Sequence, residues 1–286
     1  MTNKNFLNHS LLRLKKGSGE KNIVFIHDGC GEAIQYLTFC NQIDPEFNVY
    51  GLRFPANKDN LTPAVQDVEQ LAHVYLDYLQ AAGVDQIYLI LGYCIGGKIA
   101  YAMANQLDYD PYLVLLNVVP PNQKRKSHNF TLKEELGFLR QRILLPPRSL
   151  RQAKTTAELW QNFVSLLQTY PWAFFIVKSL MPPYMKNIIR QFRIYDQPQE
   201  VIFYLNLVRG FEETHYRYQV KENPLPSRAF YFNATKEPIK TQLYWKKLFK
   251  QITFHHVNSN HVHLIQPQNA AFIVETVRKG IAHDHN

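Results

Sequence analysis

The sequence predicts an α/β fold with a mostly parallel central sheet, helices on both faces and a helical lid insertion. Short apolar runs alternate with segments of helical spacing through the first 120 residues, and the alternation returns near the C-terminus. The runs are continuously apolar, which indicates parallel strands that are buried on both faces. We expect strands at residues 22–27, 48–54, 86–91, 112–117, 228–234 and 252–257.

Helices are expected between and after these strands, at residues 32–43, 65–83, 95–107, 239–250 and 270–281. The stretch 122–225 differs, because it reads as successive helices punctuated by proline pairs at 146–147 and 182–183. Insertions at the carboxyl edge of a parallel sheet usually lie over the ligand crevice. We therefore predict one α/β core, formed by residues 1–121 and 226–286, with the stretch between them as a lid. Alternatively, this stretch is only a structural layer of helices and not a lid.

Cysteine content and hydropathy exclude several classes of protein. The three cysteines are odd in number and widely spaced, which is typical of neither a disulfide framework nor a metal site. No stretch approaches the roughly 20 apolar residues that a membrane span requires. The N-terminus lacks the apolar core of a secretory signal. We expect a cytoplasmic protein with no metal and no membrane span.

The positive charge is concentrated in the predicted lid. Residues 122–225 hold 16 Lys and Arg against 8 Asp and Glu, which is most of the formal net charge of +9. Nucleic acid, an anionic membrane surface or an acidic protein could each use such a surface. The run QKRK at Gln123–Lys126 is too short and isolated to indicate a nucleic-acid site. The skew predicts only that the partner of this segment is negatively charged.

A candidate nucleophile lies in the motif GYCIGG, Gly92–Gly97, between an expected strand and an expected helix. The pattern matches a nucleophile elbow with cysteine in place of serine. Such a turn strains the backbone, and the residues two before and two after the nucleophile must be small so that strand and helix approach closely. Both positions are glycine. The helix N-terminus favours a thiolate, so we predict that Cys94 is the nucleophile. Cys30 and Cys40 are expected to be ordinary buried cysteines.

Candidate bases follow the last expected strand, where the sequence FHHVNSNHVHL contains four histidines. His255 and His256 lie in that strand and face opposite sides, so we expect structural roles for them. His261 begins the loop before the last helix and is the preferred base, with His263 as the runner-up. The pattern H-x-H without a nearby carboxylate or cysteine is a weak metal signal.

The residue that orients the imidazole is Asn117 or Glu237. Asn117 stands at the tip of the strand after the elbow helix, 23 residues beyond the cysteine, whereas Glu237 follows a later strand. An asparagine fixes the tautomer but brings no charge to stabilise imidazolium, and the change from Asp to Asn in a serine triad costs about 10⁴ in rate. A cysteine is less demanding, because its pKa of about 8.5 allows a thiolate–imidazolium pair before substrate arrives. Cys94, His261 and Asn117 therefore form a chemically consistent triad.

Two backbone N–H groups should bind the oxyanion. Ile95, directly after the nucleophile, supplies one at the helix N-terminus. The other is expected from the loop HDGCG after the first core strand, where Gly29 is preferred and Asp28 is second.

With these residues in hand, the chain resembles the thioesterase domains of nonribosomal peptide and polyketide synthases, which have the α/β-hydrolase fold. The resemblance runs through LLRLKKGSGEKNIVFIHDGCG, VYGLRFP, VEQLAHVYLDYL, YLILGYCIGGKIAYAMANQL, LLNVVPP and SNHVHLI. The middle insertion resembles the variable lid of that family in position and helicity. Two departures stand out: cysteine replaces the usual serine, and Asn117 replaces the usual aspartate.

The resemblance implies an acyl, peptidyl or polyketide chain carried on the phosphopantetheine of an acidic carrier protein, and no cofactor of the enzyme's own. The acyl, peptidyl or polyketide chain would pass to Cys94 and would be released by hydrolysis, or by cyclisation that forms an amide or ester. Two other interpretations stay open. Dienelactone-type hydrolases share the G-Y-C-x-G-G elbow but lack the VYGLRFP segment and the long lid at these places. A binding protein with a vestigial site is the second.

Overall fold

The computed structural model describes residues 10–55, 67–121, 207, 210–211, 214, 217–220, 224–234, 239–259, 261 and 263–284. Most of the predicted lid lies outside these residues, so its boundaries at 122 and 225 stay predictions. No helix in the described ranges is long and apolar enough to cross a membrane.

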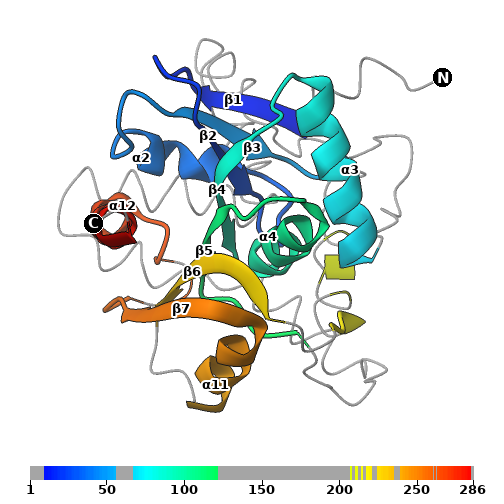
Figure 1. The fold of residues 1–286 in the computed structure, drawn as a ribbon, viewed down its shortest axis with the longest axis vertical. Coiled ribbons are helices and arrows are strands. Elements are labelled where there is room, and N and C mark those ends of the chain that lie inside the picture. Colours follow the sequence, from blue (N-terminus) through cyan, green and yellow to red (C-terminus); the bar gives the residue numbers. More distant parts are fainter. Residues whose placement is uncertain are drawn as a thin grey trace, which may run out of the picture. The chain divides into compact units, whose positions relative to one another are not determined.

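The described residues form a sheet of seven strands in the order β1-β3-β2-β4-β5-β6-β7 (Figure 1). All neighbouring strands run parallel except β1, which pairs antiparallel with β3. The mostly parallel sheet that the sequence predicts is therefore confirmed. The strands are β1 (Leu11–Lys15), β2 (Asn22–Ile26), β3 (Asn48–Leu52), β4 (Ile87–Tyr93), β5 (Tyr112–Leu116), β6 (Leu225–Asn233) and β7 (Phe249–His256).

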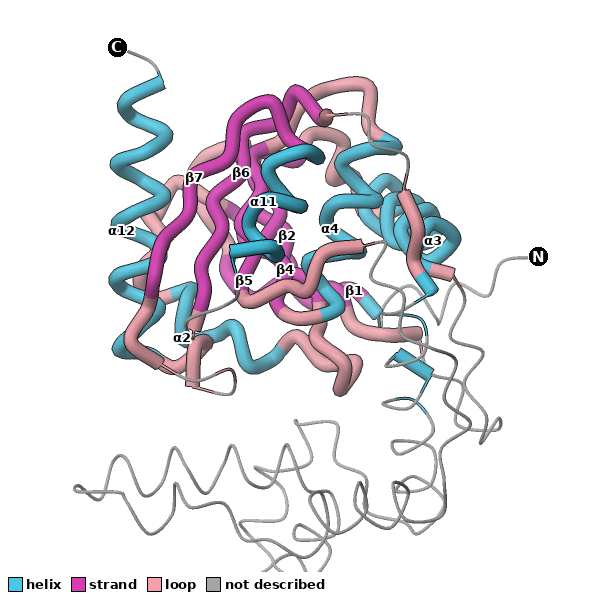
Figure 2. Tube along the Cα trace, turned by 90° about the horizontal axis from the view of Figure 1, so that it is seen from below, coloured by secondary structure: helices cyan, strands magenta, loops and turns pink. Residues whose placement is uncertain are grey.

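Helices cover both faces of the sheet, as expected from strands that are apolar on both sides. In Figures 1 and 2, α3 and α4 lie on one side of the strands and α12 lies on the other. The side chain of Asp67 starts α3 by accepting a hydrogen bond of 2.7 Å from the backbone N–H of Glu69. The helical elements are η1 (Ile34–Tyr36), α2 (Leu37–Cys40), α3 (Val68–Ala81), α4 (Ile95–Gln106), α11 (Ile239–Leu248) and α12 (Pro267–Asp284).

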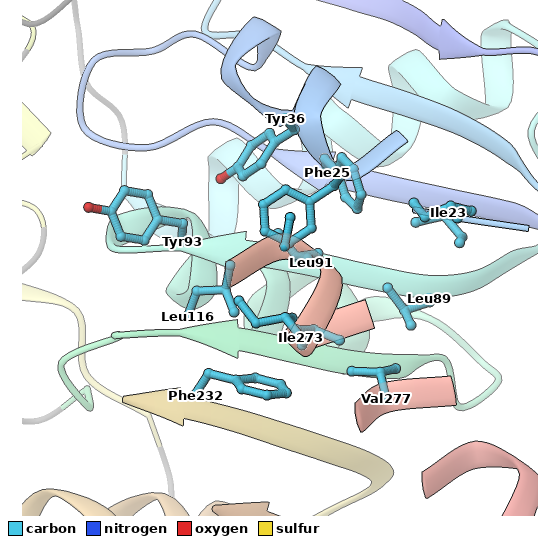
Figure 3. Packing of buried hydrophobic residues seen from close by; sticks show 14 of the residues in the cluster. Ile23, Phe25, Tyr36, Leu89, Leu91, Tyr93, Leu116, Phe232, Ile273 and Val277 are labelled. Carbon is cyan, nitrogen blue, oxygen red and sulfur yellow. The ribbon is translucent and has the colours of Figure 1, made fainter. Parts of the chain in front are cut away.

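A buried cluster fastens α12 to the sheet. Alternate strand residues such as Phe25, Leu91 and Phe232 face the same side as Ile273 and Val277 of α12 (Figure 3). Period-two alternation along each strand produces this shared face. The candidate site lies at the carboxyl ends of these strands.

Three local expectations differ from the structure. Residues 11–15 form an edge strand that the sequence analysis did not expect. The helix expected at 32–43 is only a short 3-10 turn followed by α2. The helix expected to reach 250 ends at Leu248, because the next strand already begins at Phe249.

Candidate active site

Cys94 is placed at the turn between β4 and α4 in a strained conformation. Its φ is 57° and its ψ is −123°, in a region that residues with a side chain rarely adopt. The backbone N–H of Cys94 donates to the carbonyl of Leu116 on β5 at 3.1 Å. The turn is therefore anchored to the neighbouring strand while the side chain stays half-buried. This is the geometry expected of a nucleophile elbow.

The glycines around Cys94 are required by close contact. A Cβ at Gly92 would overlap the backbone of Gly96, and a Cβ at Gly96 would overlap the carbonyl of His27. A Cβ at Gly97 would overlap the side chain of Val118. Strand, turn and helix therefore approach as closely as the motif predicts. The N-terminus of α4 begins at Ile95, directly after the sulfur-bearing residue, where its partial positive charge favours a thiolate.

Asn117 occupies a second strained position, at the end of β5. Among the described residues with a side chain, only Cys94 and Asn117 have a positive φ, and for Asn117 it is 48°. The backbone N–H of Asn117 donates to the carbonyl of Phe232 at 2.8 Å. The next carbonyl, that of Val118, accepts from Trp245 Nε1 at 2.9 Å and from the Tyr231 hydroxyl at 3.0 Å. The surrounding bonds thus hold the Asn117 side chain at the carboxyl edge of the sheet.

The side chain of Asn117 meets the imidazole of His261. Nδ2 of Asn117 lies against Nδ1 of His261, and Oδ1 of Asn117 accepts from the backbone N–H of Ala234 at 3.4 Å. Two residues that are 144 positions apart in the chain are thereby brought together. One amide group contacts both the histidine and the loop that follows β6.

Tyr93 also contacts His261, which the sequence analysis did not predict. Its hydroxyl donates to the backbone carbonyl of His261 at 2.8 Å. The two rings lie 4.7 Å apart between centroids, with an interplanar angle of 34°. Burial raises the pKa of Tyr93 well above its usual value, so the hydroxyl stays a donor. The only available signal in the sequence was an aromatic residue directly before the cysteine.

The loop between β2 and η1 contains the predicted second oxyanion donor, Gly29. No described residue accepts a hydrogen bond from its backbone N–H, and a Cβ there would meet no described atom within 4 Å. Ile95 is the first residue of α4, so its N–H has no partner within the helix. Asp28, the second candidate, uses its side chain to accept from the N–H of Cys30 at 2.8 Å. Among the described residues, the N–H of Gly29 therefore has no backbone acceptor, and the N–H of Ile95 has no partner within α4.

The same loop is clamped to the end of β3. The guanidinium of Arg53 donates two hydrogen bonds to the carboxylate of Glu32, at 2.7 and 3.0 Å, and both side chains are 14% exposed. The N–H of Phe54 donates to the carbonyl of Gly31 at 2.9 Å. A bidentate pair that is mostly buried fixes both distance and direction, so it positions the segment that carries Gly29.

The Glu32→Gln variant tests this clamp. We expect the free energy of unfolding to fall by about 1–2 kcal/mol, and turnover at the candidate site to slow by roughly tenfold because the loop shifts. Asp44→Asn is the matched control, since it breaks a pair with Arg278 whose side chains are about half exposed and should cost under about 1 kcal/mol. Chemical denaturation and single-turnover kinetics measure both effects. Equal losses of rate in the two variants would contradict the positioning role.

Two buried basic side chains lie near the elbow. Lys98 is one helical turn beyond Cys94 and is completely buried. Burial lowers the pKa of Lys98 to about 7, while the charge of Cys94 acts in the opposite direction. His27 is also completely buried, and burial lowers its pKa to about 4. Its Nδ1–H donates to the carbonyl of Asp28 at 2.6 Å, so its Nε2 accepts from the Tyr75 hydroxyl at 2.5 Å.

The remaining candidates are placed as follows. Glu237 lies outside the described residues. His263 lies in the turn before α12, where its backbone carbonyl accepts from the side chain of Asn269 at 2.8 Å. His255 and His256 lie at the end of β7, as expected. In the described ranges, no group of three His, Cys, Asp or Glu side chains could hold a metal ion.

The other two cysteines have different surroundings. Cys40 is buried, and burial raises its pKa to about 11. Cys30 is only partly buried, contrary to the expectation, because it lies in the surface loop that contains Gly29.

The sequence of the chain matches a known family. The family model of the thioesterase domain matches residues 21–281. The chain belongs to the thioesterase domain family. Component F of enterobactin synthase from Escherichia coli K12 is 26% identical over 133 residues, which are 45% of this thioesterase domain and 10% of that protein. Malpibaldin synthetase from Mortierella alpina is 29% identical over 101 residues, which are 35% of the chain and 2% of that protein. The thioesterase domain thus matches only a small part of these relatives.

A solved structure of another thioesterase domain has the same fold. The NocB thioesterase domain, in covalent complex with a fluorophosphonate nocardicin G analogue, aligns with a TM-score of 0.62 at 15% identity, over 95% of this chain and 99% of that chain. This likeness, together with the sheet described above, confirms the α/β-hydrolase fold.

Proposed function

We propose that this thioesterase domain takes an acyl, peptidyl or polyketide chain from the phosphopantetheine of a carrier protein onto Cys94. The chain is then released by hydrolysis, or by cyclisation or transfer that forms an amide or ester. The observation that carries the proposal is the strained backbone of Cys94 at the tip of β4, with φ of 57° and glycine where a side chain would block the turn. A cysteine that only filled space would not require such a conformation.

In the proposed mechanism Cys94, His261 and Asn117 act as the triad. The thiolate of Cys94 attacks the thioester carbonyl, and the N–H groups of Ile95 and Gly29 bind the oxyanion. The tetrahedral intermediate collapses, and the pantetheine thiol leaves with a proton from His261. Water or an internal nucleophile then attacks the acyl-cysteine, gives its proton to His261 and releases Cys94 as thiolate. Contact between Asn117 and His261 supports Asn117, rather than Glu237, as the residue that orients the ring.

A cysteine nucleophile suits transfer as well as hydrolysis. Exchange of one thioester for another preserves most of the acyl-transfer potential, whereas a serine ester would be less reactive. The enzyme needs no cofactor of its own in this scheme, because phosphopantetheine arrives with the substrate. The proposed partner is an acidic carrier protein, which fits the excess of Lys and Arg in residues 122–225. We propose that these residues form the lid over the site.

Intact-mass analysis tests the proposal directly. After mixing with an acyl-carrier protein or acyl-pantetheine thioester, the wild type should gain the mass of one acyl group and Cys94→Ala should gain none. Acylation of the alanine variant would reject Cys94 as the nucleophile. Turnover of small esters in preference to pantetheine thioesters would favour a dienelactone-type hydrolase. Binding of the thioester without acylation of the wild type would favour a non-catalytic binding protein.

A further inference from the structure

We infer that Tyr93 is a positioning residue, which holds His261 for proton transfer to and from Cys94. The inference rests on the proposed function and adds a residue to it. Tyr93 precedes the nucleophile in the chain, yet it contacts the base, which comes from a loop 168 residues later. One strand end therefore presents the nucleophile and also fixes the orientation of its partner.

Two contacts of different kinds support this role. The Tyr93 hydroxyl donates to the main-chain carbonyl of His261 at 2.8 Å, which ties the backbone of the loop that carries His261 to the end of β4. The Tyr93 ring lies beside the imidazole, 4.7 Å away between centroids, which restricts rotation of the histidine side chain. Tyr93 is itself 4% exposed and packs in the buried cluster. Figure 3 shows it at the end of β4, with its hydroxyl pointing away from the other labelled side chains.

Tyr93 supplies a stabilisation of the charged imidazole that Asn117 cannot provide. A triad carboxylate both orients the imidazole and stabilises its charged form. Asn117 is neutral, so it supplies orientation only. The face of an aromatic ring attracts a cation within about 6 Å, and the Tyr93 ring lies at this range from His261. Tyr93 therefore favours the imidazolium of the Cys94–His261 pair.

Other titratable groups also lie near Tyr93 and Cys94. The variants Tyr93→Phe and Tyr93→Leu leave all of them unchanged, and the control variant changes only Tyr36. The groups that act electrostatically on Tyr93 or Cys94 from the adjoining elements are Asp28, Cys30, Tyr36 and Lys98. Tyr36 offers a matched control. It is completely buried, and its hydroxyl donates to the backbone carbonyl of Ile26 at 2.8 Å. Tyr36→Phe thus removes a bond of the same kind and length. The Tyr36 hydroxyl also interacts with the backbone of Tyr93, so the variant disturbs the same region but leaves both side-chain contacts of Tyr93 with His261 in place.

The experiment measures how fast iodoacetamide alkylates Cys94 between pH 5 and 9, followed by mass spectrometry of the peptide that contains it. In the wild type, half-maximal alkylation should occur well below the usual thiol pKa of about 8.5. In Tyr93→Phe, which keeps the ring, the midpoint should move toward that value, and acylation by an acyl-pantetheine thioester should slow by roughly tenfold. Tyr93→Leu should move both further. Tyr36→Phe should leave the midpoint in place.

The outcomes separate this inference from the proposed function. A wild type that reacts only near the ordinary thiol pKa rejects the Cys94–His261 pair and the inference with it. A low midpoint in the wild type that Tyr93→Phe and Tyr93→Leu leave unchanged overturns the inference alone. An equal shift in Tyr36→Phe also overturns it, because the effect would then be a general loosening of the core. A smaller shift of the midpoint in Tyr93→Phe, which keeps the ring, than in Tyr93→Leu would support the contact between the ring and the imidazole.

Discussion

Replacing Cys94 by serine should nearly abolish acyl transfer, and adding Asn117→Asp should restore most of it. A serine hydroxyl must lose its proton to His261 during the attack, so the developing imidazolium needs a nearby negative charge. Asn117 supplies none. A cysteine avoids this demand, because its thiolate–imidazolium pair forms before substrate binds. Nucleophile and orienting residue are therefore expected to be coupled.

The hydrogen-bond partners of Asn117 give a structural reason for this coupling. Its amide faces two groups that can donate, the N–H of Ala234 and Nδ1–H of His261, but it has one oxygen. For His261 to act as base through Nε2, its ring proton must lie on Nδ1, so the Asn117 amide must present Oδ1 to Nδ1–H. With the amide turned, Nδ2 opposes the N–H of Ala234. A carboxylate accepts from both donors at once and removes the conflict.

Single-turnover acylation of four proteins measures the coupling. Relative to wild type, Cys94→Ser should be slower by about 10³-fold or more, and the double variant Cys94→Ser/Asn117→Asp should regain about 10²–10⁴-fold over the serine variant. Asn117→Asp alone should change the rate by less than about tenfold. Aspartate tolerates the positive φ of Asn117 as asparagine does, so the fold should be kept. A serine variant that is as fast as wild type, or a double variant no faster than the serine variant, would contradict the Cys–His–Asn assignment.

The sequence was sufficient to predict those features that depend on local chemistry. The elbow was predictable because the glycines at 92 and 96 are required by backbone contacts between neighbouring segments. The sheet was predictable because its inner strands are continuous apolar runs. Asn117 and His261 could be proposed because the carboxyl ends of parallel strands gather at one edge.

Features that depend on tertiary packing were missed. The strand Leu11–Lys15 contains two basic residues and lies at the sheet edge, so its pattern resembles a polar lead-in. The segment after Gly31 has helical spacing, yet only η1 and the short α2 form there. The roles of Tyr93 and Lys98 were hidden because their partners or their burial come from distant parts of the chain. A lysine in an otherwise apolar helix, IGGKIAYAMANQ, was the available signal for Lys98.

Buried Lys98 should make stability depend on pH around neutrality. Its pKa is lowered from 10.5 to about 7 by burial. Between these values the unfolded chain holds a proton that the folded chain has released, so the free energy of unfolding rises with pH across this window. Below about pH 7 both states hold the proton, and the cost of the buried charge is present in full. At about 1.4 kcal/mol per pKa unit, the rise between pH 7 and pH 9 amounts to about 2–3 kcal/mol.

Lys98→Met should remove this dependence, whatever it does to stability at a single pH. The comparison is best made in the Cys94→Ala background, because the thiol then contributes no titration and no opposing charge. Guanidinium unfolding at pH 7 and pH 9 should show that the parent loses about 2–3 kcal/mol at the lower pH relative to Lys98→Met. Lys246→Met, at an exposed position on α11, should follow the parent. Parallel pH profiles for the parent and Lys98→Met would show that Lys98 keeps its proton in the folded state despite its burial.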